Sequence, residues 1–268
     1  MSAKRAIKAL VRKAGVQRHH VAPTRMFLER HGLAMTRRRN ERPRGRILAY
    51  HTVGQPDWGV NDVAPTRFRV QLELALELGY RFVDPDEIAR TGGGPKDIAV
   101  TFDDAARTVA SQAAPVLKAL GVPYKIFVVT DWSDGKVADR VPQVMDWRAL
   151  EGLMAQGAQI GSHSVTHPDF AWLAPERYAY ELEESRKVIE ARLGVLPTTL
   201  AIPFGQSGNW PAGAGEAARA AGYDIVYAQA ENTRPAGTIP RTFVTQFDGK
   251  FLFRALLDGA FDEWEEWF

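Results

Sequence analysis

The sequence predicts an α/β fold in which parallel strands and helices alternate to form a closed or nearly closed (β/α) barrel. Short apolar runs recur along the chain, longer helical patterns separate them, and glycines end several of those patterns. Short β-branched and aromatic runs are typical of buried parallel strands. Their alternation with helices is typical of βαβ units. An open, doubly wound sheet is the second choice.

Seven apolar runs are the expected strands: Ile47–Val53, Arg81–Val83, Ile98–Phe102, Lys125–Val129, Gln159–Gly161, Thr199–Ile202 and Ile225–Ala228. Five stretches are the expected helices: Phe68–Leu78, Ala106–Leu120, Trp147–Met154, Pro175–Leu193 and Ala212–Ala221. Gly121, Gly194 and Gly222 follow three of these helices, as C-terminal caps do. This is more strand–helix units than an average open sheet contains, which favours the barrel.

Composition limits the possible chemistry. The 268 residues include no cysteine, which excludes disulfides, zinc–thiolate sites and cysteine nucleophiles, so any metal must use His, Asp or Glu. No apolar run approaches the roughly 20 residues of a membrane span. The basic N-terminus lacks the apolar core of a secretory signal, so we expect a cytoplasmic protein.

Charge divides the chain into two parts. Residues 1–46 contain 14 Lys or Arg and two acids, a net charge of +12, whereas residues 47–268 carry −10. We expect a basic N-terminal arm at 1–46 and the barrel at 47–268. Ala3–Ala14 can form a short helix, and an anionic membrane surface at the inner face is the expected partner. A flexible, solvated arm is an equal alternative, and the lack of interleaved aromatics argues against nucleic acid.

Two adjacent carboxylates, Asp103 and Asp104, follow the run Ile98–Phe102. In a (β/α) barrel the active site lies at the C-terminal ends of the strands, and buried carboxylates there need compensating partners. The structural alternative is that one aspartate caps the helix beginning near Ala106. That explanation leaves the other aspartate without a role.

His163 and His167 follow the run Gln159–Gly161. Their i, i+4 spacing lets both rings reach one ion if the intervening turn is helical, although Pro168 limits a helix there. A chance surface pair is the alternative. With a strand-end carboxylate, they predict a two-His, one-Asp site for a divalent metal ion, zinc first, with iron, cobalt or nickel as alternatives.

Two more segments fall at expected strand ends. His51 lies in the first apolar run, and Pro203, Phe204 and Gly205 follow the run Thr199–Ile202. A lone histidine is more often structural than catalytic, and the Pro-Phe-Gly segment taken alone indicates a tight turn. Its functional alternative is a backbone N–H aimed into the site, with glycine allowing close approach.

Together these motifs resemble the polysaccharide deacetylases, also called the NodB-homology or carbohydrate esterase 4 family. The matching pieces are Thr101–Asp104, His163–Pro168 and Ala201–Gly205, in the family's order. The tract Tyr50–Val53 is similar to the poly-N-acetylglucosamine deacetylase branch. The resemblance implies a distorted (β/α)7 barrel, here with a basic N-terminal extension. It also implies a hydrolase that removes N-acetyl or other acyl groups from an amino sugar, polysaccharide or lipid-linked glycan.

The resemblance implies a role for each residue of the three motifs. Asp103 would be the general base, and Asp104 would bind the metal with His163 and His167. The backbone N–H of Phe204 would help to stabilise the oxyanion.

The sequence departs from the family pattern at three points. No histidine follows His167, whereas many members of the family carry a catalytic-acid histidine in a late motif. In the poly-N-acetylglucosamine deacetylase branch that histidine comes from the first strand, and the resemblance to this branch implies His51 as the acid. Ala105 replaces the glycine common after the paired aspartates. Ala201 replaces an arginine that braces the base in many members, which leaves the partner of Asp103 open.

Two other functions compete with this one. A non-haem iron oxygenase also uses two histidines and one carboxylate, but Asp104 lies far before His163 and the chain has an α/β pattern. A catalytically inactive, carbohydrate-binding protein of the same fold is the second alternative, although every expected catalytic side chain is present.

Overall fold

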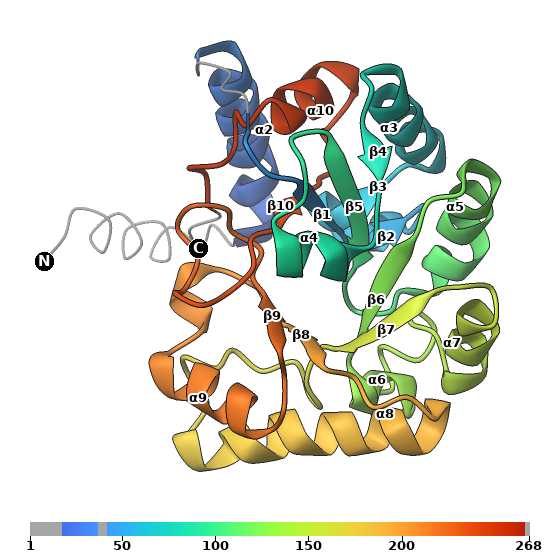
Figure 1. Cartoon of the computed structure of the whole chain (residues 1–268), viewed down its shortest axis with the longest axis vertical. Coiled ribbons are helices and arrows are strands. Elements are labelled where there is room, and N and C mark those ends of the chain that lie inside the picture. Colours follow the sequence, from blue (N-terminus) through green and yellow to red (C-terminus); the bar gives the residue numbers. More distant parts are fainter. Residues whose placement is uncertain (1–17, 37–41, 266–268) are drawn as a thin grey trace, which may run out of the picture.

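The computed structural model describes residues 18–36 and 42–265, which form a curled parallel sheet with helices around its outside (Figure 1). Every pairing in the main sheet is parallel. The expected α/β class and barrel-like architecture are therefore confirmed.

The main sheet has eight strands, seven of them in the order β10-β1-β5-β6-β7-β8-β9 and the eighth, β4, paired with β5; β2 and β3 form a separate two-stranded sheet. The strands are β1 (Arg46–Tyr50), β2 (Thr52–Val53), β3 (Asp62–Val63), β4 (Arg81–Phe82), β5 (Asp97–Phe102), β6 (Tyr124–Val128), β7 (Gln159–Ser162), β8 (Thr199–Ala201), β9 (Ile225–Tyr227) and β10 (Thr242–Phe243). A seam remains between β9 and β10. Ile239, just before β10, bridges it: its N–H donates to Val226 (2.8 Å) and its carbonyl accepts from Ala228 (2.9 Å).

The strands differ from the expected set at two places. The run at Arg81–Val83 forms β4, but β4 pairs only with the first two residues of β5 and takes no place in the main order. The seventh place belongs to β10, which pairs with β1. Two residues carry no periodicity, so the apolar pattern does not reveal β10. The first run is also split, because β1 ends before His51 and β2 begins after it.

The helices pack around the sheet. They are α2 (Arg18–Thr36), α3 (Pro65–Glu77), α4 (Pro85–Thr91), α5 (Ala114–Leu120), α6 (Thr130–Ser133), α7 (Trp147–Met154), α8 (Ser185–Leu193), α9 (Ala212–Ala220) and α10 (Lys250–Leu257). Short helical segments are η1 (Pro56–Asn61), η2 (Val109–Ala113), η3 (Pro175–Arg177), η4 (Tyr180–Glu184) and η5 (Ser207–Asn209). Gly121 and Gly194 adopt the left-handed conformation directly after α5 and α8, which confirms these two caps.

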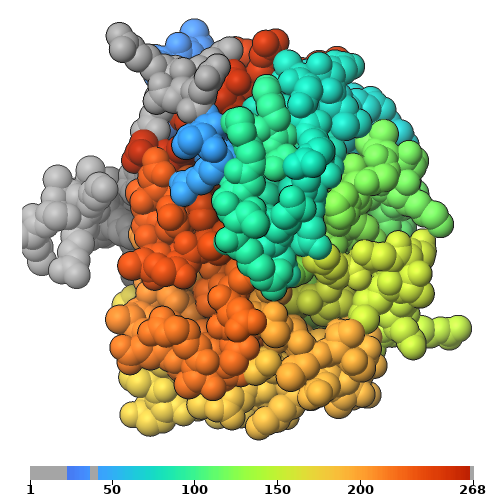
Figure 2. All heavy atoms as spheres, in the orientation of Figure 1, coloured from blue at the N-terminus to red at the C-terminus, as the bar shows by residue number. Residues whose placement is uncertain are grey.

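Helix α4 closes the N-terminal end of the curled sheet. Its Ile88 packs with Ile47 in the sheet interior. Its Asp86 accepts hydrogen bonds from Lys125 (2.5 Å) and Tyr227 (2.7 Å), which point toward that end from β6 and β9. In Figure 2 the teal atoms of the β4–α4 segment lie over the middle of this face. Because this end is filled, functional groups are expected at the opposite, C-terminal end.

Helix α2 lies within the segment that the sequence analysis assigns to the basic arm. Met26 and Ala34 are buried. Arg30 is buried as well and pairs with Asp248, which lies just before α10, through two bonds of 2.7 and 2.9 Å. A chain shortened to begin at Gly45 would therefore leave Asp248 buried without its cation.

Ala3–Ala14 lies outside the described residues, so its helix and its contact with an anionic membrane stay predictions. Among the described helices, none combines the length and the apolarity that crossing a bilayer requires.

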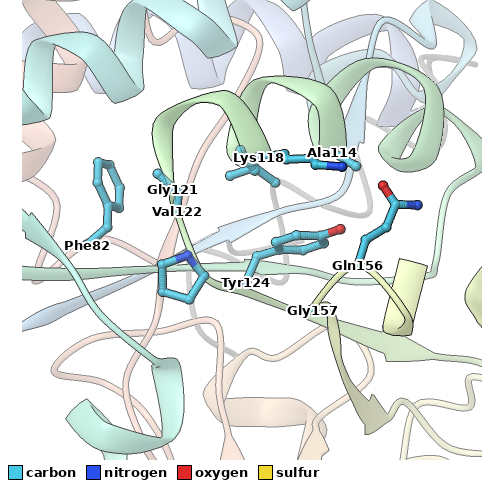
Figure 3. A pocket seen from close by; sticks show the side chains of 10 residues that line it. Phe82, Ala114, Lys118, Gly121, Val122, Tyr124, Gln156 and Gly157 are labelled. Atoms are coloured by element: carbon cyan, nitrogen blue, oxygen red, sulfur yellow. The ribbon is translucent and has the colours of Figure 1, made fainter. Parts of the chain in front are cut away.

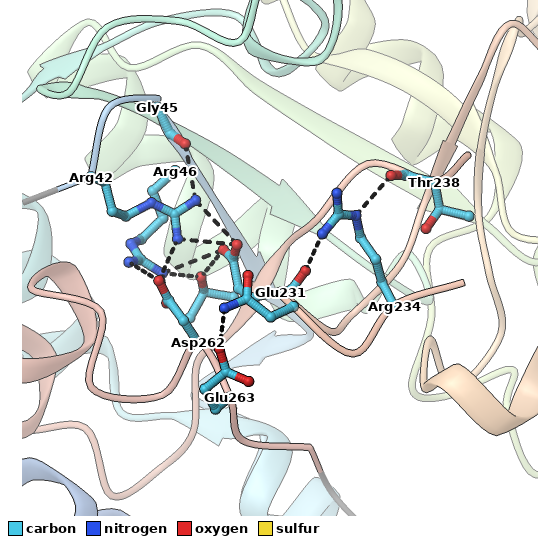
Figure 4. A network of polar contacts seen from close by, with 10 residues as sticks. Arg42, Gly45, Arg46, Glu231, Arg234, Thr238, Asp262 and Glu263 are labelled. Carbon is cyan, nitrogen blue, oxygen red and sulfur yellow. Dashed lines mark hydrogen bonds and ion pairs between the residues drawn. The ribbon is translucent and has the colours of Figure 1, made fainter. Parts of the chain in front are cut away.

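An ion-pair network ties the start of β1 to the C-terminal segment (Figure 4). Arg46 approaches Asp262 at 2.9 Å and Glu231 at 3.3 Å. Arg42 contacts the same two carboxylates at 2.9 and 3.0 Å. Burial acts to raise the pKa of Glu231, but the two arginines outweigh it and lower that pKa. Glu231 is therefore ionised in the folded protein.

A surface cavity of about 520 Å³ lies between α5 and the end of α7 (Figure 3). Its walls include Leu117 and Lys118 of α5, Tyr124 at the start of β6, and Gln156 after α7. The lining thus belongs to the N-terminal side of the sheet. None of the candidate site residues from the sequence analysis lines it.

Candidate active site

The two aspartates lie in a turn directly after β5. The N–H of Asp103 donates to the carbonyl of Tyr50 on the neighbouring strand (2.9 Å). Asp104 and Ala105 then have φ angles of 65° and 51°. This left-handed conformation costs a residue with a Cβ roughly 1–2 kcal/mol. The turn is therefore strained, and Ala105 occupies a position whose backbone conformation glycine would adopt without steric cost.

Arg241 is the partner of Asp103. Its two terminal nitrogens donate to the two carboxylate oxygens at 2.7 and 2.8 Å, and both side chains are buried. Its Nε donates to the carbonyl of Ala228 (2.9 Å), so one guanidinium also links the two sides of the seam. Burial acts to raise the pKa of Asp103, but Arg241 holds that pKa well below its usual range. Asp103 is therefore ionised, and both of its oxygens are oriented.

Asp104, His163 and His167 converge on one point. One ligand atom from each lies within 4.8 Å of the others, and no second group of this kind occurs in the described part of the chain. Oδ1 of Asp104 is 3.6 Å from Nε2 of His163 and 3.5 Å from Nε2 of His167. This oxygen is buried and has no hydrogen-bond partner among residues 18–36 and 42–265.

The two imidazoles are neutral in the folded protein. Burial lowers the pKa of His163, and burial together with the nearby His163 lowers that of His167 well below its usual value. Nδ1 of His163 lies 2.8 Å from the carbonyl of Ala201. A carbonyl can only accept, so Nδ1 carries the proton and Nε2 presents its lone pair toward Asp104. Burial and the charge of Asp103 raise the pKa of Asp104 to about 8.

The loop His163–Pro168 brings its two histidines together without the helical turn that the sequence analysis required. Ser164 and His167 instead have φ angles of 68° and 61°. Glu181, buried in η4, braces the loop by accepting bonds of 2.8–3.0 Å from two backbone N–H groups and one hydroxyl of Val165–Thr166. Sequence reasoning missed Glu181, because a glutamate within a helical pattern looks like a solvated residue.

His51 lies between β1 and β2, at the same end of the sheet. Its buried ring meets Phe243 of β10 edge-on, with 5.6 Å between centroids. Its Nδ1 has no hydrogen-bond partner within the described chain. Burial lowers the pKa of His51 to about 4, and the charge of Asp103 acts in the opposite direction. The ring is therefore neutral at neutral pH and lies within the field of Asp103.

The turn Pro203–Gly205 follows β8 and borders the His163–Pro168 loop. Phe204 has a φ of 63°, and its half-exposed ring lies 4.7 Å from that of His167. Gly205 has a φ of 67°, and a Cβ there would overlap Gln229, whose N–H donates to the Gly205 carbonyl (2.7 Å). Glycine is therefore required at this close approach, which fixes Phe204 beside the histidines.

The structure thus brings the sequence-predicted residues to one end of the sheet and adds Arg241 to them. The one sequence signal for Arg241 is its place in an otherwise apolar and β-branched tract, Ile239–Val244. A cation in such a tract implies a buried anionic partner. The partner's identity requires the fold, because Asp103 lies 138 positions away.

Comparison with protein families shows what the chain is similar to. A family model described as polysaccharide deacetylase matches residues 90–226, half of the chain. The Bacillus subtilis (strain 168) protein named "Putative polysaccharide deacetylase YxkH" is 25% identical over 166 residues, which cover 60% of this chain. The matched region covers only 56% of that relative.

Comparison with solved structures concerns the fold. The chain resembles the Streptococcus pyogenes deacetylase PplD, solved in complex with acetate (TM-score 0.65, 22% identity, 76% of this chain and 93% of that one). It also resembles IcaB from Ammonifex degensii (TM-score 0.66, 23% identity, 82% of this chain and 98% of that one). A third similar structure is a de-N-acetylase from Aggregatibacter actinomycetemcomitans (TM-score 0.66, 18% identity, 80% of this chain and 99% of that one). At these identities the likeness establishes a shared fold.

Proposed function

The chain belongs to the polysaccharide deacetylase family, and on this premise we propose that it is a metal-dependent hydrolase that removes N-acetyl groups from an amino sugar or polysaccharide. The observation that carries the proposal is the convergence of Asp104, His163 and His167 beside the oriented carboxylate of Asp103. Other N-acyl groups would be open to the same chemistry.

The three converging residues fit a divalent metal ion. Oδ1 of Asp104 is buried without a partner, and the bond from Nδ1 of His163 to Ala201 leaves Nε2 free to coordinate. Two imidazole nitrogens and one carboxylate suit zinc, our first choice, and also iron, cobalt or nickel. When bound, such an ion polarises a carbonyl oxygen and lowers the pKa of water from 15.7 to about 7.

Asp103 is the proposed general base. Its pKa is held low by Arg241, so it is weakly basic but always ionised and fixed in direction. It accepts a proton from the water that attacks the amide carbon. Catalysis by such a group depends on position more than on basicity, and a well-placed base contributes roughly 10²–10⁴-fold.

His51 is the proposed proton donor to the leaving nitrogen. The attack forms a bond from the water oxygen to the amide carbon and moves a proton from the water to Asp103. Because His51 is neutral in the free site, the proton that it donates is the one released by the water, and the carbon–nitrogen bond breaks as the nitrogen takes it up. Acetate and a free amino sugar are the products. The ring is buried near Asp103 and has an unpaired Nδ1, which leaves it free to exchange a proton with the reacting groups.

The turn Pro203–Gly205 is the proposed oxyanion support. The left-handed Phe204 lies against His167, so its backbone N–H is a candidate donor to the oxygen that becomes negative. Losing one such donor costs roughly 10²–10³-fold in rate. The fixed contact between Gly205 and Gln229 would keep that donor in place.

Acetate release tests the function directly. The full chain is loaded with zinc, stripped with a chelator and reloaded, and acetate released from N-acetylglucosamine oligosaccharides is measured at each stage. We expect activity that disappears on stripping and returns on reloading. Sugar binding without acetate release by the loaded protein would contradict the proposal and favour a catalytically inactive, carbohydrate-binding protein.

Two variants separate the proposed roles. His163→Ala should lose stoichiometric metal, and Asp103→Asn should keep the metal but lose most activity. Circular dichroism controls for folding in both. Full metal retention by His163→Ala would contradict the ligand assignment, and loss of metal from a folded Asp103→Asn would require the roles of the aspartates to be reassigned.

A further inference from the structure

The segment between α6 and α7 is anchored next to the paired aspartates. The N–H of Met145 donates to the carbonyl of Ala105 (2.9 Å), and Ala106 forms a β-bridge with Val144. Arg140 lies in this segment. Its position is therefore tied to the turn that carries Asp104.

The guanidinium of Arg140 stacks on two indole rings. It lies 4.3 Å from the ring centroid of Trp132 and 5.3 Å from that of Trp58. Trp132 in turn lies 5.2 Å from the ring of His167, one of the proposed metal ligands. Two ring contacts thus connect Arg140 with the centre of the candidate site.

Arg140 lacks the carboxylate partner that neighbouring cations have. Lys136 pairs with Asp131 and Asp134, and Arg192 also pairs with Asp134. Arg140 makes one side-chain hydrogen bond, to the amide oxygen of Gln143 (3.3 Å). No carboxylate of residues 18–36 or 42–265 forms an ion pair with it.

Stacking leaves this cation able to bind an anion. An aromatic face stabilises a guanidinium above its plane, whereas the N–H groups point outward within the plane and match a carboxylate or phosphate in a bidentate arrangement.

A neutral N-acetylated sugar would offer such a cation only uncharged hydroxyl and carbonyl oxygens, and residues 47–268 as a whole carry a net charge of −10. We propose that Arg140 recognises an oxyanion on the substrate, a carboxylate or a phosphate, close to the N-acyl group that is removed. This inference rests on the proposed function and narrows its substrate class to anionic glycans. The alternative is that Arg140 only holds the two indoles in place.

Binding by the metal-loaded chain tests the inference with two matched pairs of probes. The first pair is an oligosaccharide that alternates N-acetylglucosamine with glucuronate, and the same oligosaccharide with its carboxyl groups reduced to alcohols. The second pair is N-acetylglucosamine 1-phosphate and the methyl glycoside of N-acetylglucosamine. Isothermal titration calorimetry gives the affinity ratio within each pair, and the pair with the larger ratio identifies the anion.

We expect the anionic member of one pair to bind about tenfold more tightly, as one charge-assisted contact provides. Arg140→Gln should reduce that ratio toward one, and Arg140→Lys should keep part of it because the charge remains. Arg148→Gln, an equal change of charge on the exposed surface of α7, is the control and should keep the full ratio.

Two results would overturn the inference. One is an affinity ratio near one in both pairs. The other is an affinity ratio that Arg140→Gln does not alter, and an unaltered ratio with an equal loss of affinity for both members of a pair is the signature of a residue that only holds Trp58 and Trp132. Failure to release acetate from any probe would contradict the proposed function instead, because the affinity ratios do not depend on turnover.

Discussion

The pairing of Arg241 with Asp103 can be tested by removing the cation. Arg241→Met keeps an unbranched side chain that can pack near Phe127, whose ring centroid lies 5.2 Å from the guanidinium. It removes both bonds to the carboxylate and the bond to the Ala228 carbonyl. Asp103 would then be buried as an anion without a partner.

The expected cost follows from this burial. Removing one partner of a buried ion pair destabilises a protein by about 3–5 kcal/mol, whereas replacing both partners with uncharged groups is often neutral. For a protein of this size, such a loss corresponds to a fall in Tm of roughly 6–20 °C. Asp103→Asn should show a similar loss, because it leaves Arg241 unpaired. The double variant should be more stable than the sum of the two losses predicts.

The energetic coupling between Arg241 and Asp103 is measured by thermal and urea unfolding of four proteins: the unaltered protein, the two single variants and the double variant. All four are stripped of metal beforehand. Arg81→Met is the matched control, because Arg81 pairs with Asp97 at 2.9 Å but its side chain is 70% exposed. Such surface pairs contribute about 0–1 kcal/mol. If Arg241→Met unfolds at the midpoint of the unaltered protein, or if the two losses simply add, Asp103 does not depend on Arg241 as the structure implies.

Three further predictions concern other parts of the structure. His51→Ala should slow acetate release by roughly 10²–10⁴-fold, as expected for a general acid, without displacing metal; an unchanged kcat would contradict its role. Gly205→Ala should lower the Tm, because a Cβ would overlap Gln229 at a φ of 67°, and a Tm equal to that of the unaltered protein would show that the turn can relax. Glu231→Gln tests pH dependence, because the pKa of Glu231 is lowered on folding. The ionised form of Glu231 stabilises the folded protein above the pKa of the unfolded state, and this stabilisation is lost as the pH falls through the lowered pKa of the folded state. The variant should therefore be less stable at pH 7 and lose less stability between pH 7 and pH 3, and a parallel loss in both proteins would argue against the Arg46 network.

The sequence is informative where function depends on local order along the chain. Asp103 and Asp104 follow a recognisable strand, and His163 and His167 follow another, so the parallel arrangement alone brings them to one end of the sheet. The expected helical turn between the histidines is absent, yet the pair still meets, because left-handed residues achieve the same approach.

The sequence is uninformative where function depends on distant partners. Arg241 lies 138 positions from Asp103 and directly precedes β10, a strand of only two residues. Arg140 sits in a segment without regular structure, and only the fold places it over Trp132. Helix α2 shows a third limit: it lies in the basic segment, and only the fold reveals that Arg30 is buried and that Asp248 compensates its charge.

The seam between β9 and β10 also sets the order in which the molecule can be completed. A chain is synthesised from its N-terminus, and 138 positions separate Asp103 from Arg241, so the nascent chain carries the anion long before its cation exists. Compaction around Asp103 during that interval would bury an uncompensated charge, which is unfavourable. Docking of β10 therefore closes the barrel and orients the Asp103 carboxylate in the same step. A product truncated before residue 241 would have neither the closed barrel nor the oriented carboxylate.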